Sequence, residues 1–260
     1  MEVTEKVVIF KYNNGKIEEM EDVVVKESPF TIFLNKEELL TLLCTPKSLD
    51  YLTYGFLLSE GFIKSKDDIK SISLLEEEGR VDIETNNKST IANKLLGKRT
   101  MTTGCGKGTT FYNALDSFNS KQIHSEMIVQ GEDLIGIINK FNKASNLFLN
   151  TGGVHSASLS DGKELLLFHE DVGRHNALDK IIGEAFVKDI DLKDKFMITS
   201  GRISSEMLIK AAKREIPMIV SRSAPTDLAI ALGKQLGITI VGFARGMRMN
   251  IYSNGQRIIF

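Results

Sequence analysis

The stretch FMITSGRISSEMLIKAAKREIPMIVSRSAPTDLAIALGKQLGITIVGF, residues 196–243, alternates short apolar runs with longer amphipathic ones. The apolar runs have the length of buried strands, and the longer runs repeat apolar residues at helical spacing. The predicted elements are strands at 196–199, 218–221 and 239–243 and helices at 203–213 and 225–236. Strand–helix units of this length are typical of a parallel or mixed sheet covered by helices, so the sequence predicts an α/β fold.

The same alternation extends in both directions from this stretch. Asp161-Gly162 separates two apolar runs that predict a pair of strands, and two amphipathic segments predict helices. These elements are strands at 157–159 and 165–169 and helices at 129–148 and 174–187. Toward the C-terminus, Asn254-Gly255 lies between apolar pairs at 251–252 and 258–259, which predicts a terminal hairpin.

The N-terminal part of the chain has a different, β-rich pattern. Asn13-Asn14-Gly15 predicts the turn of one hairpin, and Glu78-Gly79 predicts the turn of another. Between them, Asn35 precedes an apolar-periodic run as a helix N-cap would, and Gly61 ends a second helical pattern. The predicted elements are strands at 7–10, 23–25, 30–34, 71–75 and 81–84, and helices after Asn35 and over 48–62.

A polar segment at 86–110, rich in Asn, Lys, Thr and Gly, separates the two patterns and predicts an exposed loop. The sequence therefore predicts three parts. They are a β-rich N-terminal domain, 1–99, a loop and connector, 100–125, and an α/β domain, 126–260.

The composition is that of an ordinary soluble protein, with 42% hydrophobic and 26% charged residues. Thirty-three basic and thirty-four acidic residues leave a net charge of −1, which argues against a nucleic-acid or anionic-membrane partner. No apolar run approaches the ~20 residues of a membrane span, and the N-terminus lacks the apolar core of a signal peptide. We therefore expect a cytoplasmic protein with two reduced cysteines, of which Cys44, after a leucine-rich run, packs in the core.

The other cysteine, Cys105, is the first residue that predicts chemistry. Gly104, Gly106 and Gly108 surround it and would keep its thiol accessible, and the Lys107 ammonium would favour the thiolate. The thiolate is the form that transfers sulfur, reacts with alkylating agents or binds metal. The alternative is a loop cysteine without a role.

Four junctions between strands and helices predict an anion-binding edge. In open α/β sheets, ligands bind at the carboxyl ends of strands, where helix N-termini present free N–H groups. Three junctions also carry an arginine, Arg174, Arg202 or Arg222, which can pair with phosphate. They predict a phosphate-bearing ligand, unless their glycines and serines only form turns and caps. The junctions are 150–153, 171–175, 199–202 and 221–224.

The segment GFARGMRMN, 242–250, predicts a further part of that ligand's site. Arg245 and Arg248 can clamp a diphosphate, and Phe243 offers a face on which a base can stack. From Gly201 onward the chain carries nine basic and three acidic residues. A local basic surface on a nearly neutral chain suits one specific anion, although a solvated basic face would give the same count.

The histidines do not predict a metal site. His155, His169 and His175 lie within a short stretch, but the zinc-deaminase pattern of His-x-Glu with a later Pro-Cys-x-x-Cys does not occur. We expect His155 and His175 in a polar pocket at strand ends, and His124, between polar neighbours, in solvent.

Together these segments resemble the formate dehydrogenase accessory protein family, FdhD, over nearly the whole chain and in the family's order. DVGRHNALDK is the most specific of them. The matching stretches are CTPKSLDYLTYGFLLSEGFI (44–63), the loop around Cys105, NTGGVHSAS (150–158), EDVGRHNALDKIIG (170–183), SGRISSEM (200–207) and SRSAPTDLAIALGKQLGITIVGFARGMRMNIYS (221–253).

The resemblance implies a sulfurtransferase with a cytidine-deaminase-like α/β fold. Family members accept sulfur from a cysteine desulfurase as a persulfide and pass it to the molybdenum cofactor of formate dehydrogenase, the bis(molybdopterin guanine dinucleotide) form. The persulfide cysteine maps onto Cys105, guanine nucleotides would mimic the cofactor, and a homodimer is implied. The cofactor-binding stretch of the family maps onto Phe243, Ala244, Arg245, Gly246, Met247 and Arg248.

One position departs from the family pattern. Many members carry Cys-x-x-Cys in the loop, whereas Gly108 stands at the second position here, so no disulfide can form within it. Two other functions stay open. One is a chaperone that binds and delivers the molybdenum cofactor without transferring sulfur, and the other is a hydrolase that pairs Cys105 with His155 or His175.

Overall fold

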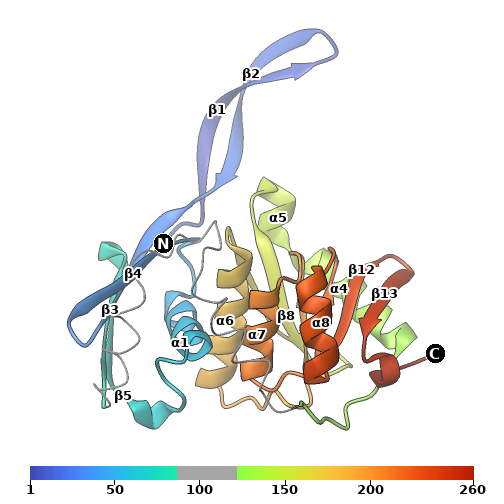
Figure 1. Cartoon of the computed structure of the whole chain (residues 1–260). Coiled ribbons are helices and arrows are strands. Elements are labelled where there is room, and N and C mark those ends of the chain that lie inside the picture. Colours follow the sequence, from blue (N-terminus) through green and yellow to red (C-terminus); the bar gives the residue numbers. More distant parts are fainter. Residues whose placement is uncertain (87–121) are drawn as a thin grey trace.

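A six-stranded mixed sheet forms the centre of the computed structural model, which describes residues 1–86 and 122–260 (Figure 1). Its strand order is β13-β12-β11-β10-β8-β9, in which β10, β11 and β12 are parallel and the other neighbours are antiparallel. The mixed α/β class is therefore confirmed, while the likeness to cytidine deaminases stays a prediction. The strands are β8 (His155–Ser160), β9 (Leu165–Asp171), β10 (Phe196–Thr199), β11 (Met218–Ser221), β12 (Thr239–Arg245) and β13 (Arg248–Ser253).

Both faces of this sheet are buried at its centre, because alternate residues of β10, β11 and β12 enter different hydrophobic clusters. Phe196 and Ile198 of β10 pack with helix α4, whereas Met197 between them packs with the helices of the other face. The helices are α4 (Gly131–Ala144), α5 (Asn146–Thr151), α6 (Arg174–Val187), α7 (Ser205–Lys213) and α8 (Asp227–Leu236). None of the helices in the described ranges is long and apolar enough to span a membrane.

The N-terminal part adds a second sheet, with the order β4-β3-β6-β5, and a long hairpin of β1 and β2 that projects from the body (Figure 1). Helix α1 lies between this sheet and α6. The elements are β1 (Thr4–Asn13), β2 (Lys16–Val25), β3 (Ser28–Leu34), β4 (Glu37–Cys44), α1 (Leu49–Glu60), β5 (Ile69–Leu75) and β6 (Arg80–Thr85), with short 3-10 turns at Lys66–Asp68, Glu76–Glu78 and, near the C-terminus, Gly255–Arg257.

Helices α1 and α6 touch through their backbones at two glycines. A Cβ atom on Gly55 would lie 1.7 Å from the carbonyl oxygen of Asp179, and one on Gly183 would lie 1.9 Å from that of Tyr51. Real Cβ atoms are not found at such distances, so only glycine permits this approach. The main hydrophobic cluster consequently continues from Phe30 in the N-terminal sheet to Ile240 in the central one.

The predicted helix after Asn35 is wrong, because that segment is strand β4. Asn35 and Lys36 have φ values of 53° and 72°, which form a tight two-residue turn from β3 into β4. The Asn35 carboxamide oxygen accepts a hydrogen bond from the Thr85 N–H at 2.9 Å, so the residue anchors a turn and not a helix. Leu42 and Cys44 then alternate toward the core.

The single helix predicted at 129–148 is divided in the structure. Val129–Gln130 forms strand β7, and buried Ser145 separates α4 from α5. The Ser145 hydroxyl donates to the Glu170 carboxylate at 2.5 Å, and that carboxylate accepts the Phe148 N–H at 3.2 Å. Glu170 therefore stabilises a new helix start inside the predicted helix.

The predicted terminal hairpin is also wrong. Strand β13 pairs antiparallel with β12, and the last strand, β14 (Ile258–Ile259), pairs in parallel with β7. Asn254, with a φ of 47°, donates its side-chain N–H groups to the Gly233 and Ile238 carbonyl oxygens at 2.8 and 2.9 Å. These bonds direct the chain toward the end of α8 and away from β13.

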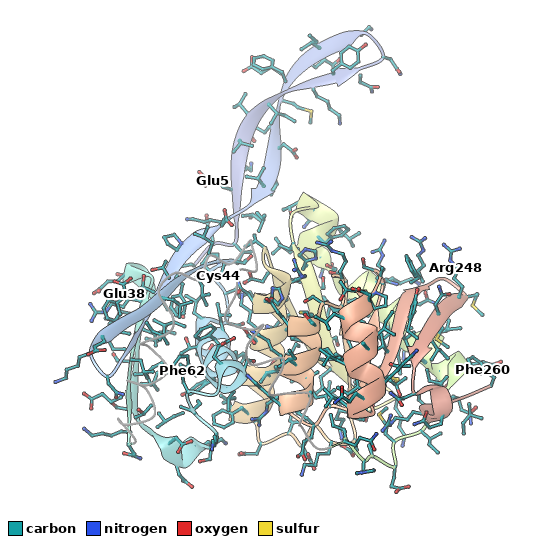
Figure 2. All side chains as sticks on the ribbon, in the orientation of Figure 1. Glu5, Glu38, Cys44, Phe62, Arg248 and Phe260 are labelled. Carbon is teal, nitrogen blue, oxygen red and sulfur yellow. The ribbon has the colours of Figure 1, made fainter. Side chains whose placement is uncertain are left out.

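The other predicted elements are found, and α6, β10 and β11 have the predicted bounds. Figure 2 shows Cys44 at the end of β4, where the prediction of core packing is confirmed because its side chain is fully buried. The division at 99 and 125 stays a prediction, since residues 87–121, with Cys105, Lys107 and Gly108, lie outside the described ranges.

Candidate functional site

One edge of the central sheet gathers the predicted junctions. Parallel strands β10, β11 and β12 all end there. Because β8 is antiparallel to β10, it begins at the same edge, and β9 ends there, with His155 opposite Asp171. The junctions at 150–153, 171–175, 199–202 and 221–224 therefore come from four different places in the chain to one edge.

A cavity of about 510 Å³ opens at this edge. Its basic side chains come from different strands. His155 belongs to β8, Arg222 follows β11, and Arg245 ends β12. Ser200 and Ser223 also line it and belong to the predicted junctions 199–202 and 221–224, whereas Phe148, which lines it too, was not predicted as a site residue. The polar and aromatic lining includes His155, Ser200, Arg222, Ser223, Phe243 and Arg245.

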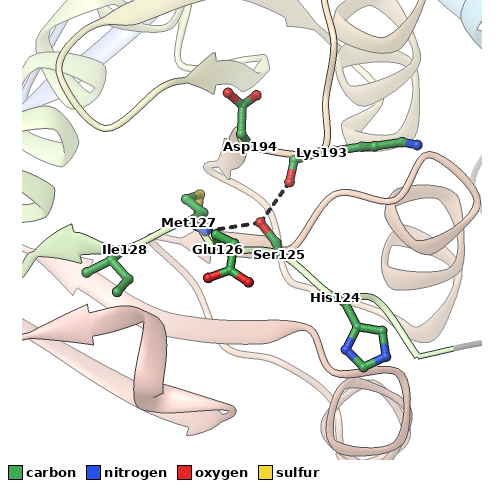
Figure 3. A pocket seen from close by; sticks show the side chains of 7 residues that line it. All are labelled: His124, Ser125, Glu126, Met127, Ile128, Lys193 and Asp194. Atoms are coloured by element: carbon green, nitrogen blue, oxygen red, sulfur yellow. Dashed lines mark hydrogen bonds between the residues drawn. The ribbon is translucent and has the colours of Figure 1, made fainter.

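A second hollow, of about 420 Å³, lies at the opposite edge, where Lys193 and Asp194 precede β10 (Figure 3). The Ser125 hydroxyl there donates to the Lys193 carbonyl oxygen at 2.8 Å. His124 lines this hollow and not the cavity at the strand carboxyl ends. None of the described residues that line the hollow is an arginine, so the edge at the strand carboxyl ends is the better anion site.

The predicted stretch 243–248 is divided between the cavity and the core. An irregularity in β12 between Gly242 and Arg245 turns Phe243, with a φ of 51°, and Arg245 outward into the cavity lining. Ala244 is fully buried and belongs to the cluster under α4. The remaining three residues form or flank the exposed turn into β13, where Figure 2 shows Arg248. These three are Gly246, Met247 and Arg248.

Hydrogen bonds hold the loops of this edge in place. The Ser221 hydroxyl donates to the Gly201 carbonyl oxygen at 2.6 Å and accepts the Ser223 N–H at 2.8 Å. The Phe243 N–H donates to the Ser223 carbonyl oxygen at 3.0 Å. The three strand ends are thus joined, and the side chains that point from them are preorganised.

The motif DVGRHNALDK mainly builds support for the edge. The Asp171 carboxylate accepts hydrogen bonds from the Gly173 and Thr45 N–H groups and from Asn176 Nδ2, at 2.9, 3.1 and 2.9 Å. Lys180 Nζ completes its shell at 2.6 Å, and both charged side chains are 0% exposed. Such a pair is stable only when its hydrogen bonds are satisfied, which this shell achieves. This role was not predicted.

Cys44 precedes the segment that Asp171 holds. Burial, and secondarily the Asp171 charge, raise the pKa of its thiol to about 12. It therefore stays protonated at neutral pH and cannot replace Cys105 as a thiolate. Among residues 1–86 and 122–260, moreover, no group of three or more His, Cys, Asp and Glu side chains could hold a metal ion.

The two histidines of the predicted polar pocket occupy different depths. His155 lines the cavity, and burial followed by the Arg174 and Arg202 charges lowers its pKa. His175 lies deeper, where burial, then Lys210, Arg174 and His155, lower its pKa to about 3. Its Nε2 lies 3.3 Å from a Glu206 carboxylate oxygen without making a hydrogen bond.

The lowered pKa of His175 predicts a pH-dependent stability. Between pH 6.5 and about 3 the unfolded chain binds a proton at His175 that the folded chain does not, so stability is lost as pH falls. This one group contributes up to about 1.4 kcal/mol per pH unit. Urea unfolding of the wild type and of His175→Gln at pH 7, 6 and 5 measures it. The variant should lose stability less steeply, and equal slopes would contradict the assignment.

The comparisons with known proteins agree on one family. A family model described as FdhD/NarQ matches residues 25–259. The sulfur carrier protein FdhD of Bacillus subtilis is 40% identical over 250 residues, which cover 96% of this chain and 95% of that protein. The sulfur carrier protein FdhD of Listeria innocua is 41% identical over 261 residues, which cover 99% of this chain and 100% of that protein.

A solved structure extends this agreement to the fold. The crystal structure of a Desulfotalea psychrophila protein, assigned as a formate dehydrogenase accessory protein, superposes with a TM-score of 0.80. The two sequences are 26% identical, and the match covers 99% of this chain and all of that one.

Proposed function

Because the chain belongs to the FdhD/NarQ family, whose curated relatives are named sulfur carrier proteins, we propose that it carries sulfur for the maturation of formate dehydrogenase. In this proposal Cys105 receives sulfur as a persulfide from a cysteine desulfurase in the cytoplasm. The recipient is the bis(molybdopterin guanine dinucleotide) form of the molybdenum cofactor, bound as a substrate. The protein would act as a homodimer and a sulfurtransferase.

The arginine-bearing cavity is the observation that supports a nucleotide-linked substrate. Arg245 reaches the cavity from the end of β12, Arg248 flanks the adjacent exposed turn, and neither has an ion pair within the described ranges. Two guanidinium groups at a two-residue turn can each make paired hydrogen bonds to a diphosphate. Phe243, 37% exposed, would pack against a base or pterin ring.

The first transfer follows from thiolate chemistry. The Cys105 thiolate attacks the outer sulfur of the donor persulfide, the S–S bond of the donor breaks, and the donor cysteine leaves as a thiolate. Cys105 then holds the sulfur in a new S–S bond. When that sulfur leaves as sulfide, the receiving metal centre supplies two electrons and the Cys105 thiolate is regenerated.

Mass spectrometry tests the persulfide directly. The protein is incubated with a cysteine desulfurase and cysteine, and we expect a mass gain of about one sulfur atom, about 32 Da, which reductant removes. Peptide mapping should place it on Cys105 and not on Cys44. Absence of the gain, together with retained cofactor binding, would instead favour the chaperone that only delivers the cofactor.

Removal of one arginine tests the binding half of the proposal. Arg248→Ala should weaken binding of guanosine diphosphate roughly tenfold or more, because a lost charge-assisted contact costs about 1.5–3 kcal/mol. Titration calorimetry measures the change. Lys234→Ala is the matched control, since it removes an exposed positive charge near the C-terminus of α8, at the other edge of the sheet. Equal affinity in the two variants would refute the role of Arg248.

A further inference from the structure

We infer that a second anion-binding subsite, which takes a phosphate or diphosphate group, lies at the β8 end of the cavity. His155 and Ser200 line the cavity there, and Arg174 and Arg202 lie beside them. This subsite is separate from the turn that carries Arg245 and Arg248. The inference deepens the proposed function and rests on it only for the identity of the whole ligand.

The geometry brings these four residues together around Gly201. A Cβ atom on Gly201 would lie 3.0 and 3.1 Å from Cβ and Cδ of Arg174 and 3.5 Å from Nδ1 of His155. The Arg174 side chain therefore extends along the Gly201 backbone beside His155. Ser200 Oγ lies 3.4 Å from the same His155 nitrogen, and Arg202 is the next residue along the chain.

The charges of this cluster are not neutralised within the described part of the chain. Neither Arg174 nor Arg202 makes an ion pair there, and the buried Nε atom of Arg174 has no hydrogen-bond partner. The nearby Asp171 carboxylate is already satisfied by Lys180 and backbone N–H groups, and Glu206 lies against His175. A buried donor without an acceptor is costly, and an oxyanion would supply that acceptor.

The electrostatics of the cluster agree with this geometry. Burial and the neighbouring Arg202 lower the pKa of Arg174, with Glu206 acting in the opposite sense. Burial, followed by the Arg174 and Arg202 charges, also lowers the pKa of His155. The positive charge of Arg174 is thus disfavoured by burial and by Arg202, and a bound anion would favour it.

The cluster lies at a different place along the edge of the sheet from Arg245. Arg245 ends β12, which lies three strand spacings from β8, about 14 Å. His155 and Ser200 thus hold their anion beside β8 and β10, whereas Arg245 holds its anion beside β12. A ligand with two separate diphosphates, as the proposed cargo has, matches two cationic ends of one cavity.

Inorganic pyrophosphate is the probe that counts the subsites. In titration calorimetry on the full chain, we expect two pyrophosphates per wild-type chain and one in each of Arg202→Ala and Arg245→Ala. Lys234→Ala, the matched charge control, should still bind two. Arg202 is exposed, so its removal leaves the packing of the edge intact, and circular dichroism checks the fold.

Competition separates this inference from the proposed function. Saturation with guanosine diphosphate should occupy the Arg245 end, so that only one pyrophosphate still binds. The affinity for this remaining pyrophosphate should fall at least tenfold in the double variant Ser200→Ala/Arg202→Ala. One or no pyrophosphate on the wild-type chain, or an unchanged count in Arg202→Ala, overturns the subsite. If guanosine diphosphate or the persulfide fails while the pyrophosphate counts hold, the subsite stands and only the proposed cargo is lost.

Discussion

Adding one methyl group at Gly183 is expected to destabilise the protein by more than about 3 kcal/mol, or to prevent folding altogether. The added Cβ atom would lie 1.9 Å from the Tyr51 carbonyl oxygen and 2.8 Å from the Gly55 nitrogen. Both are backbone atoms of α1, which cannot rotate away as a side chain could. Relief therefore requires the two helices to separate, which would open the cluster that contains Leu52 and Ile181.

Urea unfolding of Gly183→Ala against the wild type measures this effect. Gly136→Ala is the control, because Gly136 lies in α4 and a Cβ atom there would meet nothing within 4 Å. That variant should gain about 0.5–1 kcal/mol from the better helix propensity of alanine. If both variants unfold at the same urea concentration, the backbone contact between α1 and α6 is not what makes glycine necessary.

Replacement of Cys105 with alanine is expected to abolish sulfur transfer completely while guanosine diphosphate binding stays at the wild-type value. The thiolate is the acceptor of the sulfur atom, and no other thiol is available to replace it, because Cys44 is buried with a pKa of about 12. The readout is recovery of formate dehydrogenase activity in a strain that lacks the protein.

Cys44→Ala is the matched control for this experiment. It removes the other thiol of the chain from the core, so it should cost some stability but keep sulfur transfer. Recovery of formate dehydrogenase activity by Cys105→Ala would refute the persulfide assignment. Loss of nucleotide binding in the same variant would mean that Cys105 contributes to the cavity in another way.

Elements with a strong local pattern could be predicted from the sequence, and those fixed by distant partners could not. The bounds of β10 and β11 follow from four-residue apolar runs in the centre of a sheet buried on both faces. The segment after Asn35 has leucines that suit either a helix or a strand. Its structure is decided by the left-handed turn and by pairing with β3, which local periodicity does not contain.

The residues of the candidate site also divide into those whose position could be predicted from the sequence and those whose position could not. The edge that carries Arg222 and Arg245 follows from the parallel strand order, so its location was predictable. The inward position of Ala244 depends on an irregularity in β12. The pairing of Asp171 with Lys180 joins the end of β9 to a buried position of α6, and its only sequence signal was a lysine beside the apolar stripe of α6.

The projecting hairpin restricts the directions from which a macromolecule can reach the cavity. At its base, a Cβ atom on Gly153, which lines the cavity, would lie 2.6 Å from Val25 at the end of β2. The hairpin therefore rises beside the cavity mouth (Figure 1), and exposed Val8, Phe10 and Tyr12 lie along it. A protein that approaches from that side therefore meets these exposed apolar side chains, and the acidic residues of β2 opposite them, before it reaches the cavity.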